Sequence, residues 1–412
     1  MNSLCKSSPS TMVDEVHWDG EGPLSAEAVT DPINSACIKV IGPCHPTLVS
    51  SDINSLNRLP YTRREDAFLT FADSAPCTYK EVLKAPDKEL WLAAINKELN
   101  SMEKLQVWEV VEQHNNFKLV RTTWVFRLKK GHSNGAIKHK ARLCAQGSTQ
   151  TQGIDFEKTY AQTAHLNSLQ TLIAFEAAKG LKFHQIEIKS SFWNAPLLEE
   201  VYLQIPQDLE LNERRWCLRL NKAIYRLKQD PLAWYKFLKE WLVGAHFQAC
   251  ILDPCVFYWA GIKPIWLHLH VNDITVFGNE ISEFKEEISS KFEIKDLGTA
   301  NLLLGVKITQ EEDCIYLDQK HFCELLLSQY GMSECKPTCT PLVPKEQLLV
   351  ETQEEIEKLE LLKVSYCSAI GSINYLSTET LPDLSFAISS LSQYLENPGV
   401  KHWNDFFMFF FT

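Results

Sequence analysis

The sequence predicts an α+β fold preceded by a polar N-terminal arm. Helical and strand periodicities follow one another in irregular order after about residue 75. They do not alternate regularly, as the strands and helices of parallel βαβ units would. The 412 residues, 45% of them hydrophobic, provide enough apolar material for two or three packed units.

The arm covers residues 1–75, which are rich in Ser, Asp, Pro and Asn and have no sustained hydrophobic period. Such a composition is typical of a disordered linker. The 13 cysteines are odd in number and no signal peptide precedes them, which indicates a reducing, intracellular compartment. No run approaches the roughly 20 apolar residues of a membrane span. We therefore expect a soluble cytoplasmic protein.

Three helices are predicted from apolar residues at helical spacing. The first covers 87–105, with an apolar stripe made of Leu90, Trp91, Ala94, Ile95, Leu99 and Met102. The second runs from Asn167 or Ser168 to Gly180, where glycine suits a helix end. The third starts at Asp230 and Pro231, and its apolar side is made of Trp234, Phe237, Leu238 and Trp241.

A basic hairpin is predicted between the first two helices, with its turn in "GHSNGA". The segment 118–146 has no Asp or Glu. Its cations are Lys118, Arg121, Arg127, Lys129, Lys130, Lys138, Lys140 and Arg142, eight positive charges in all. They form either a phosphate-binding surface or an ordinary solvated face, although the whole chain has a net charge of −11.

A strand and a second hairpin follow. In "LKFHQIEIKSSF", Ile186 and Ile188 point to one face and Glu187 to the other. In "WLHLHVNDITVFG", two apolar runs meet at Asn272-Asp273. Asn and Asp are frequent in two-residue turns, so this pair forms either a simple turn or a turn that also carries a metal site.

Six blocks occur in order along the chain: "KHKARLCAQG", "QIEIKSSFWNAPLLEEVYLQIP", "KAIYRLKQDPLAWY", "HVNDITVFG", "KFEIKDLGTANLLLGVKI" and "YCSAIGSINYLSTETLPD". Together they resemble the reverse transcriptases of copia-type LTR retrotransposons, over about residues 75–403. The resemblance implies a right-hand polymerase with fingers and palm over 76–335 and a thumb or connection-like helical region over 336–403. Residues 404–412 then form an aromatic tail, which is either aberrant or caps a neighbouring core.

The resemblance also implies a catalytic trio, Glu187, Asn272 and Asp273, and a two-metal mechanism of template-directed DNA synthesis with Mg²⁺. Glu187 and Asp273 would hold the metal. The family has Asp at all three positions, so the trio falls from three carboxylates to two, and Glu187 is longer by one methylene. We therefore expect a degenerate copy with little polymerase activity. The alternative is a remnant that binds nucleic acid without catalysis.

Further roles follow from the same resemblance. The nucleotide-binding residues would be Lys140, Arg142, Phe192 and Gln229. The primer- and template-binding residues would be Lys129, Lys130, Lys138, Lys228, Leu304 and Gly305. Simple core packing is the other interpretation of Leu304 and Gly305. Arg226 stands where the family usually has Gly, and it either crowds the template or lies on a surface loop.

The expected partners are an RNA or DNA template with its primer and deoxynucleoside triphosphates. The RNase H and integrase regions of a family polyprotein are not recognisable in this chain. Active members of the family work in virus-like particles.

Overall fold

The structure is a computed structural model that describes residues 37–41, 75–130, 137–206, 209, 215–261, 263–311, 314–336, 340–342, 348–362 and 364–411. Its helices are α1 Tyr79–Val82, α2 Lys88–Lys104, α3 Leu166–Ala178, α4 Asp230–Gly244, α5 Ile281–Lys291, α6 Lys320–Gln329, α7 Gln353–Leu361, α8 Tyr366–Glu379, α9 Ser385–Ser392 and α10 Val400–Phe406, with 3₁₀ turns η3 Gly147–Thr149, η4 Ser191–Asn194, η5 Pro382–Leu384 and η6 Phe407–Phe411.

The strands belong to four sheets. Their bounds are β1 Cys37–Ile41, β2 Trp108–Glu112, β3 Leu119–Val120, β4 Thr122–Lys130, β5 Ile137–Ala145, β6 His184–Ile188, β7 Tyr202–Leu203, β8 Trp216–Leu220, β9 Gln248–Ala249, β10 Val256–Trp259, β11 Ile265–His270, β12 Asp273–Gly278, β13 Ile294–Thr299, β14 Leu302–Leu303, β15 Val306–Gln310 and β16 Cys314–Asp318. Helices and antiparallel strands are thus mixed along the described part of the chain, as the α+β prediction requires.

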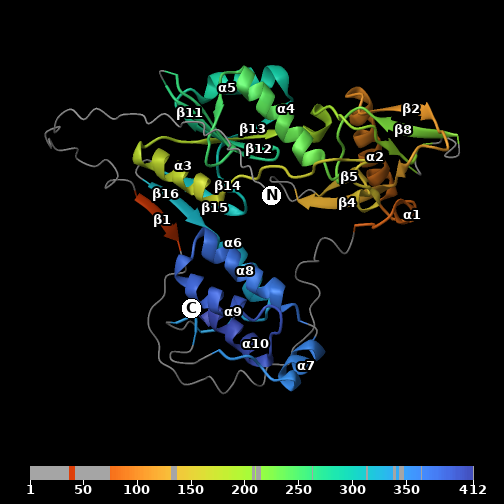
Figure 1. Ribbon diagram of the computed structural model, residues 1–412. Coiled ribbons are helices and arrows are strands. Elements are labelled where there is room, and N and C mark those ends of the chain that lie inside the picture. Colours follow the sequence, from red (N-terminus) through yellow and green to blue (C-terminus); the bar gives the residue numbers. More distant parts are fainter. Residues whose placement is uncertain are drawn as a thin grey trace, which may run out of the picture. The chain divides into compact units, whose positions relative to one another are not determined.

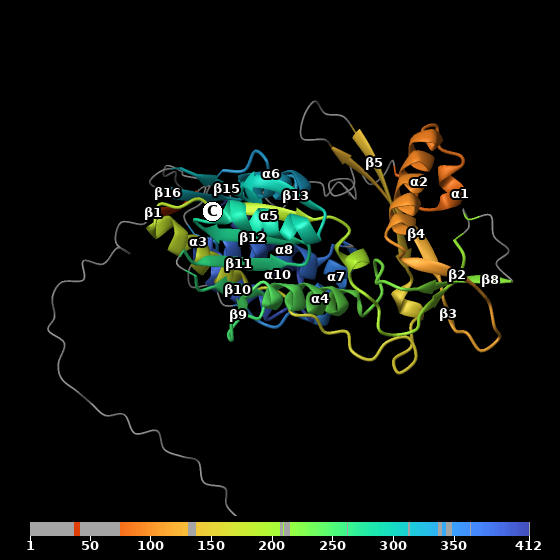
Figure 2. The ribbon, with the colours of Figure 1, turned by 90° about the horizontal axis from the view of Figure 1, so that it is seen from above.

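The central sheet has six strands in the order β13-β6-β12-β11-β10-β9, and every neighbouring pair is antiparallel (Figures 1 and 2). One face packs against α4 and α5, where Trp234 and Phe284 join Ile186 and Ile188 in one apolar core. The other face is covered at one end by α3 and the β14–β16 strands. The alternation of Ile186, Glu187 and Ile188 therefore places the carboxylate on the face away from α4.

The basic hairpin formed by β4 and β5 packs against α2 (Figure 2). Trp91, Ile95 and Met102 of α2 are buried against Phe126 and other residues on one face of the hairpin. Leu90, which we had placed in the apolar stripe, is instead 55% exposed. It lies about 100° around the helix from Trp91, at the edge of the contact.

The C-terminal helices form a separate apolar core in which α8, α9 and α10 pack together (Figure 1). Phe406 is completely buried there and Phe409 is 7% exposed. Two aromatic residues of the tail, Phe406 and Phe409, thus belong to the apolar core of the C-terminal helices. Burying large aromatic rings removes much apolar surface from water, which stabilises this unit.

Three local features differ from the sequence prediction. Residues 37–41, inside the expected arm, form β1, which pairs in parallel with β16. The remainder of the arm, 1–36 and 42–74, lies outside the described residues. Helix α3 begins at Leu166 rather than at Asn167 or Ser168. The turn of the second hairpin is formed by Val271 and Asn272, because Asp273 already pairs with His270 as the first residue of β12.

In the part of the chain that the structure describes, no helix combines the length and apolar character needed to cross a membrane.

Candidate active site

The candidate site is a row of polar side chains across four strands of the central sheet. Strand register places Lys295 of β13 opposite Glu187 of β6, Glu187 opposite Asp273 of β12, and Asp273 opposite His270 of β11. Directly opposed residues share a face and have Cβ atoms about 5 Å apart. The structure therefore brings together the two carboxylates that the sequence analysis had assigned to the metal.

The turn beside this row is strained. Val271 has φ of +58°, a left-handed conformation in which a β-branched residue is a clear outlier. The indole Nε1 of Trp234 donates a hydrogen bond of 2.7 Å to the carbonyl oxygen of Val271. The backbone N–H of Ile188 donates one of 2.8 Å to the carbonyl oxygen of Asn272. Contacts from α4 and from β6 thus fix the backbone of the turn, which includes Asn272, the third member of the trio.

The electrostatics of Asp273 reflect its neighbours. Burial raises the pKa of its carboxyl, and the negative charge of Glu187 raises it further. His270 and a hydrogen bond from Gln185 act in the opposite direction. Two carboxylates that repel each other in a half-buried position are stabilised by a cation placed between them.

Glu187 and Asp273 fit a hard divalent cation, because such ions prefer carboxylate and amide oxygens. Asn272 can add an amide oxygen but no charge. Among the described residues, no group of three or more His, Cys, Asp or Glu side chains is arranged to hold a metal. The trio as a whole therefore carries two formal negative charges, those of Glu187 and Asp273.

Two of the predicted nucleotide-binding residues, Arg142 and Phe192, both contact Tyr225. The guanidinium carbon of Arg142, in β5, lies 4.9 Å from the centre of the Tyr225 ring. The ring of Phe192, in η4, meets Tyr225 edge-on at 5.6 Å. Burial raises the pKa of Tyr225 to about 12, so its hydroxyl remains protonated at neutral pH. Tyr225 thus connects the basic hairpin to the segment that follows β6.

The Glu98 carboxylate of α2 lies close to the cations of the hairpin. Burial raises the pKa of Glu98 to about 7, and the charges of Lys140 and Arg142 limit this rise. The register opposes Lys140 to Arg127 and Arg142 to Val125, on the face of the hairpin away from Trp124 and Phe126. Glu98 is thus an acidic neighbour of Lys140 and Arg142 that the sequence analysis had not singled out.

Gln229 differs from the expected nucleotide ligand because it is 2% exposed. Its Oε1 accepts from Nε2 of Gln150 at 3.0 Å, and its own Nε2 donates to the carbonyl oxygen of Asp155 at 2.8 Å. Both ends of the amide are thus used within the chain. Gln229 acts in this structure as a link between the start of α4 and the 150–155 segment.

Lys228 and Arg226 are exposed neighbours of Gln229. The ammonium of Lys228 lies 4.8 Å over the ring of Phe156. Arg226 has φ of +70°, which explains why glycine suits this position. A Cβ on Gly147 would collide with the backbone carbonyl oxygen of Arg226, so two backbones approach closely here.

Leu304 and Gly305 form the two-residue turn between β14 and β15, with φ of +50° and +86°. The hydroxyl of Tyr375, in α8, donates to the carbonyl oxygen of Leu304. The same hydroxyl occupies the space that a Cβ at position 305 would need. This turn is therefore supported by the C-terminal helices, and Leu304 is 39% exposed rather than part of a core.

The remaining basic residues are distributed as follows. Lys138 is exposed. The backbones of Lys129 and Lys130 belong to β4, but their side chains lie outside the described set, as does the 131–136 turn. Lys118 forms an ion pair with the buried Asp155, so at least one of the eight cations is neutralised within the fold.

Sequence reasoning missed three contributors to the site. Glu98 could have been found, because it falls on the apolar stripe between Ile95 and Met102, where a carboxylate is unusual. Trp234 was recognised as a core residue, but its bond to the hairpin turn depends on tertiary packing. Lys295 joins the row only through strand register.

Comparison with known proteins identifies the family of this chain. The family described as reverse transcriptase (RNA-dependent DNA polymerase) matches residues 105–344, and the chain belongs to this family. A Pol polyprotein from transposon TNT 1-94 of Nicotiana tabacum is 33% identical over 342 residues, which cover 80% of this chain and 26% of the polyprotein.

Other similar proteins come from plants and yeast. A Pol polyprotein from transposon RE2 of Arabidopsis thaliana is 28% identical over 84% of this chain, and the match covers 24% of that polyprotein. The transposon Ty1-JR2 Gag-Pol polyprotein of Saccharomyces cerevisiae is 23% identical over 78% of the chain and covers 19% of that polyprotein. The predicted resemblance is confirmed, and the chain spans about a quarter or less of these relatives.

Proposed function

We propose that this chain is the polymerase segment of a copia-type Pol polyprotein and that its own catalytic activity is weak. The observation that carries the proposal is the pairing of Glu187 with Asp273 across β6 and β12, beside a tight turn. In this proposal the central sheet is the palm, the basic hairpin with α2 belongs to the fingers, and α8 to α10 form the thumb or connection.

The proposed substrates are a template with its primer and deoxynucleoside triphosphates. Glu187 and Asp273 would hold Mg²⁺, with the amide oxygen of Asn272 as a further ligand. When bound, Mg²⁺ would lower the pKa of the primer hydroxyl and stabilise negative charge on the triphosphate. Lys140 and Arg142 would attract the triphosphate, and Phe192 would limit the space at the sugar.

The proposed weakness of catalysis follows from the donor set. Asn272 carries no charge. The side chain of Glu187 is longer than that of the Asp usual at this position, so it must adopt a different rotamer to bring its carboxylate to the same ion. Loss of about 4 kcal/mol of transition-state stabilisation would slow the reaction roughly a thousandfold. Gln229 would contribute by fixing the start of α4, since both ends of its amide are engaged within the chain.

A primer-extension assay tests this proposal. Extension of a DNA primer on an RNA template is expected to be very slow with Mg²⁺, and the double variant Glu187→Asp, Asn272→Asp is expected to be faster. An Asn374→Asp variant, which adds one charge at an exposed position of α8, serves as the control. Rapid extension by the unmodified chain would contradict the proposed weakness of catalysis.

The second candidate function is binding of nucleic acid without catalysis. It is favoured by the basic face of the hairpin, which is separate from the carboxylates and does not depend on them. Affinity for a primer-template duplex should fall steeply with salt, because phosphate contacts release counterions. Binding that persists while extension stays undetectable in the double variant would favour this second function over the first.

A further inference from the structure

A short segment of the N-terminal arm, residues 37–41, forms one edge of a four-stranded sheet. As strand β1 it pairs in parallel with β16, and β15 pairs with the other side of β16 (Figure 1). The segment reads CIKVI, and three of its five residues are β-branched, which favours an extended strand. Without β1, the backbone groups along one side of β16 would form an open sheet edge. Residues 37–41 therefore act as a strap that closes this edge.

The register of the strap aligns two cysteines. Cys37, the first residue of β1, is the Cα partner of Cys314, the first residue of β16. Neighbouring strands of a sheet lie about 4.8 Å apart. A disulfide joins residues whose Cα atoms are about 4.4 to 6.8 Å apart, so aligned positions on neighbouring strands fall within this range. The fold thus places two cysteines that are distant in the sequence at a separation that a disulfide can bridge.

Cys314 lies on the more open face of its strand. Ile315 and Leu317 belong to the apolar core beneath α3. Side chains alternate along a strand, so Cys314 projects to the opposite face with Tyr316 and Asp318, which are both partly exposed. Cys314 itself is 8% exposed, and its thiol is free. A small oxidant therefore approaches this thiol from the face away from α3.

We propose that Cys37 and Cys314 form a redox-controlled lock, which fastens the strap to β16 within one chain. The oxidant is a low-molecular-weight disulfide such as oxidised glutathione. One cysteine thiolate attacks it and releases one glutathione, and the second cysteine then attacks the mixed disulfide and releases another. The two cysteines are oxidised to one disulfide, and their protons and two electrons leave in two molecules of reduced glutathione. Under reducing conditions, backbone pairing alone holds the strap.

The lock would fix the arm to the sheet that contains the Leu304-Gly305 turn. This turn joins β14 and β15, which belong to the same sheet as β16. A disulfide between residues distant in the sequence restricts the open chain more than the closed one, so it favours the docked strap. The inference concerns the arm and does not depend on the proposed function.

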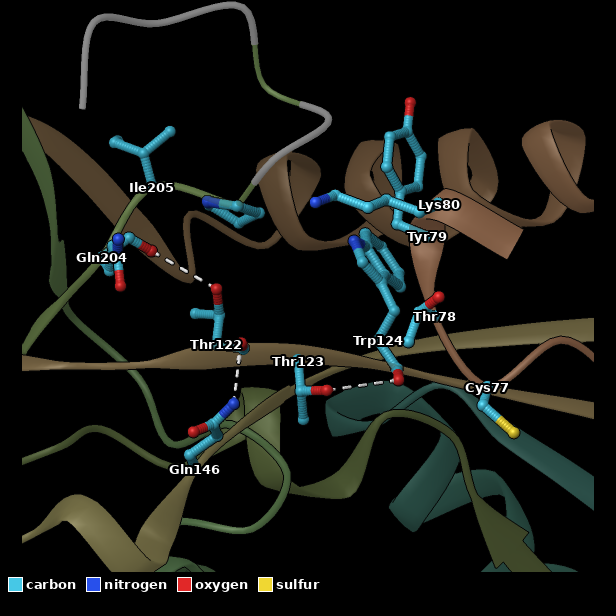
Figure 3. Close-up of a pocket in the computed structure, with 11 residues that line it drawn as sticks. Cys77, Thr78, Tyr79, Lys80, Thr122, Thr123, Trp124, Gln146, Gln204 and Ile205 are labelled. Carbon is cyan, nitrogen blue, oxygen red and sulfur yellow. Dashed lines mark hydrogen bonds between the residues drawn. The ribbon is translucent and has the colours of Figure 1, made fainter. Parts of the chain in front are cut away.

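Peptide mapping of the full chain after incubation with oxidised glutathione and alkylation tests the lock. A disulfide between Cys37 and Cys314 is expected, and the chain should remain a monomer on a non-reducing gel. Cys77 is the reference thiol, because it is exposed and is the one cysteine among the described residues that line the pocket in Figure 3. It should acquire glutathione alone. Absence of the Cys37–Cys314 disulfide, or its formation between two copies, would overturn the inference.

Trypsin supplies a second measurement, because Lys39 lies inside the strap and cleavage after it requires β1 to open locally. Oxidation is expected to slow this cleavage by about 10-fold or more relative to cleavage after Arg58, which lies in the arm beyond the strap. Cys37→Ser and Cys314→Ser should each abolish the effect of oxidation. Cys44→Ser is the matched control in the same arm and should retain it. Equal slowing in Cys37→Ser and in the unmodified chain would overturn the lock, as would no slowing in either.

Discussion

Restoring a carboxylate at position 272 is expected to make the stability of this chain depend on Mg²⁺. Asn272 precedes Asp273, and Asp273 lies directly opposite Glu187. An Asn272→Asp variant therefore places a third negative charge beside Glu187 and Asp273. Burial already raises the pKa of Asp273, and the charge of Glu187 raises it further. The turn itself should change little, because Asn and Asp have similar backbone preferences.

The magnitude follows from Coulomb's law. Two unit charges about 6 Å apart repel by roughly 0.7 kcal/mol in water and about 3 kcal/mol at an effective dielectric constant of 20. The site is half-buried, so a loss of about 1 to 2 kcal/mol is expected without metal, equivalent to a fall in Tm of a few degrees. An ion present at about 100 times its Kd restores about 2.7 kcal/mol, because it binds only the folded site.

Thermal melts of the unmodified chain and of Asn272→Asp, in EDTA and in millimolar MgCl₂, measure the effect. The variant should melt lower than the parent in EDTA and should gain more from MgCl₂. Asn374→Asp controls for a general effect of added charge and should gain no more than the parent. If Mg²⁺ shifts Asn272→Asp no more than this control, the hairpin tip is only a turn and the proposed metal site is wrong.

Three further outcomes are expected. Arg226→Gly should raise the free energy of unfolding by roughly 0.5 to 1 kcal/mol in urea titrations, because φ of +70° strains any residue with a Cβ; equal or lower stability would contradict this. Tyr375→Phe should cost about 1 kcal/mol and speed amide exchange at Gly305, since the bond to Leu304 is lost; unchanged exchange would mean that this bond does not hold the turn. Burial raises the pKa of Glu98 to about 7. The folded chain therefore binds a proton at Glu98 more tightly than the unfolded chain does. The contribution of this group to the free energy of unfolding falls as pH rises from about 4.5 to 7. The difference in free energy of unfolding between Glu98→Gln and the parent should therefore favour the variant by up to about 3 kcal/mol more at about pH 8 than at about pH 5. If the free energies of unfolding of the two proteins change in parallel with pH, the raised pKa of Glu98 is refuted.

The sequence by itself determined the order of the elements and the family. The alternation of Ile186, Glu187 and Ile188 was enough to place the carboxylate on the face away from the core, because side chains of a strand alternate by covalent geometry. The helical stripe of Trp91, Ile95 and Met102 was enough to identify the buried face of α2 in the same way.

Tertiary structure alone decided which distant residues meet. The pairing of Glu187 with Asp273 depends on strand register, and the burial of Gln229 depends on Gln150 and Asp155, which lie more than 70 residues earlier in the chain. The backbone of Arg226 is left-handed, in spite of the preference of arginine, and lies in close contact with Gly147. Local propensities extend over a few residues, whereas these features arise from packing between segments that only the folded chain brings together.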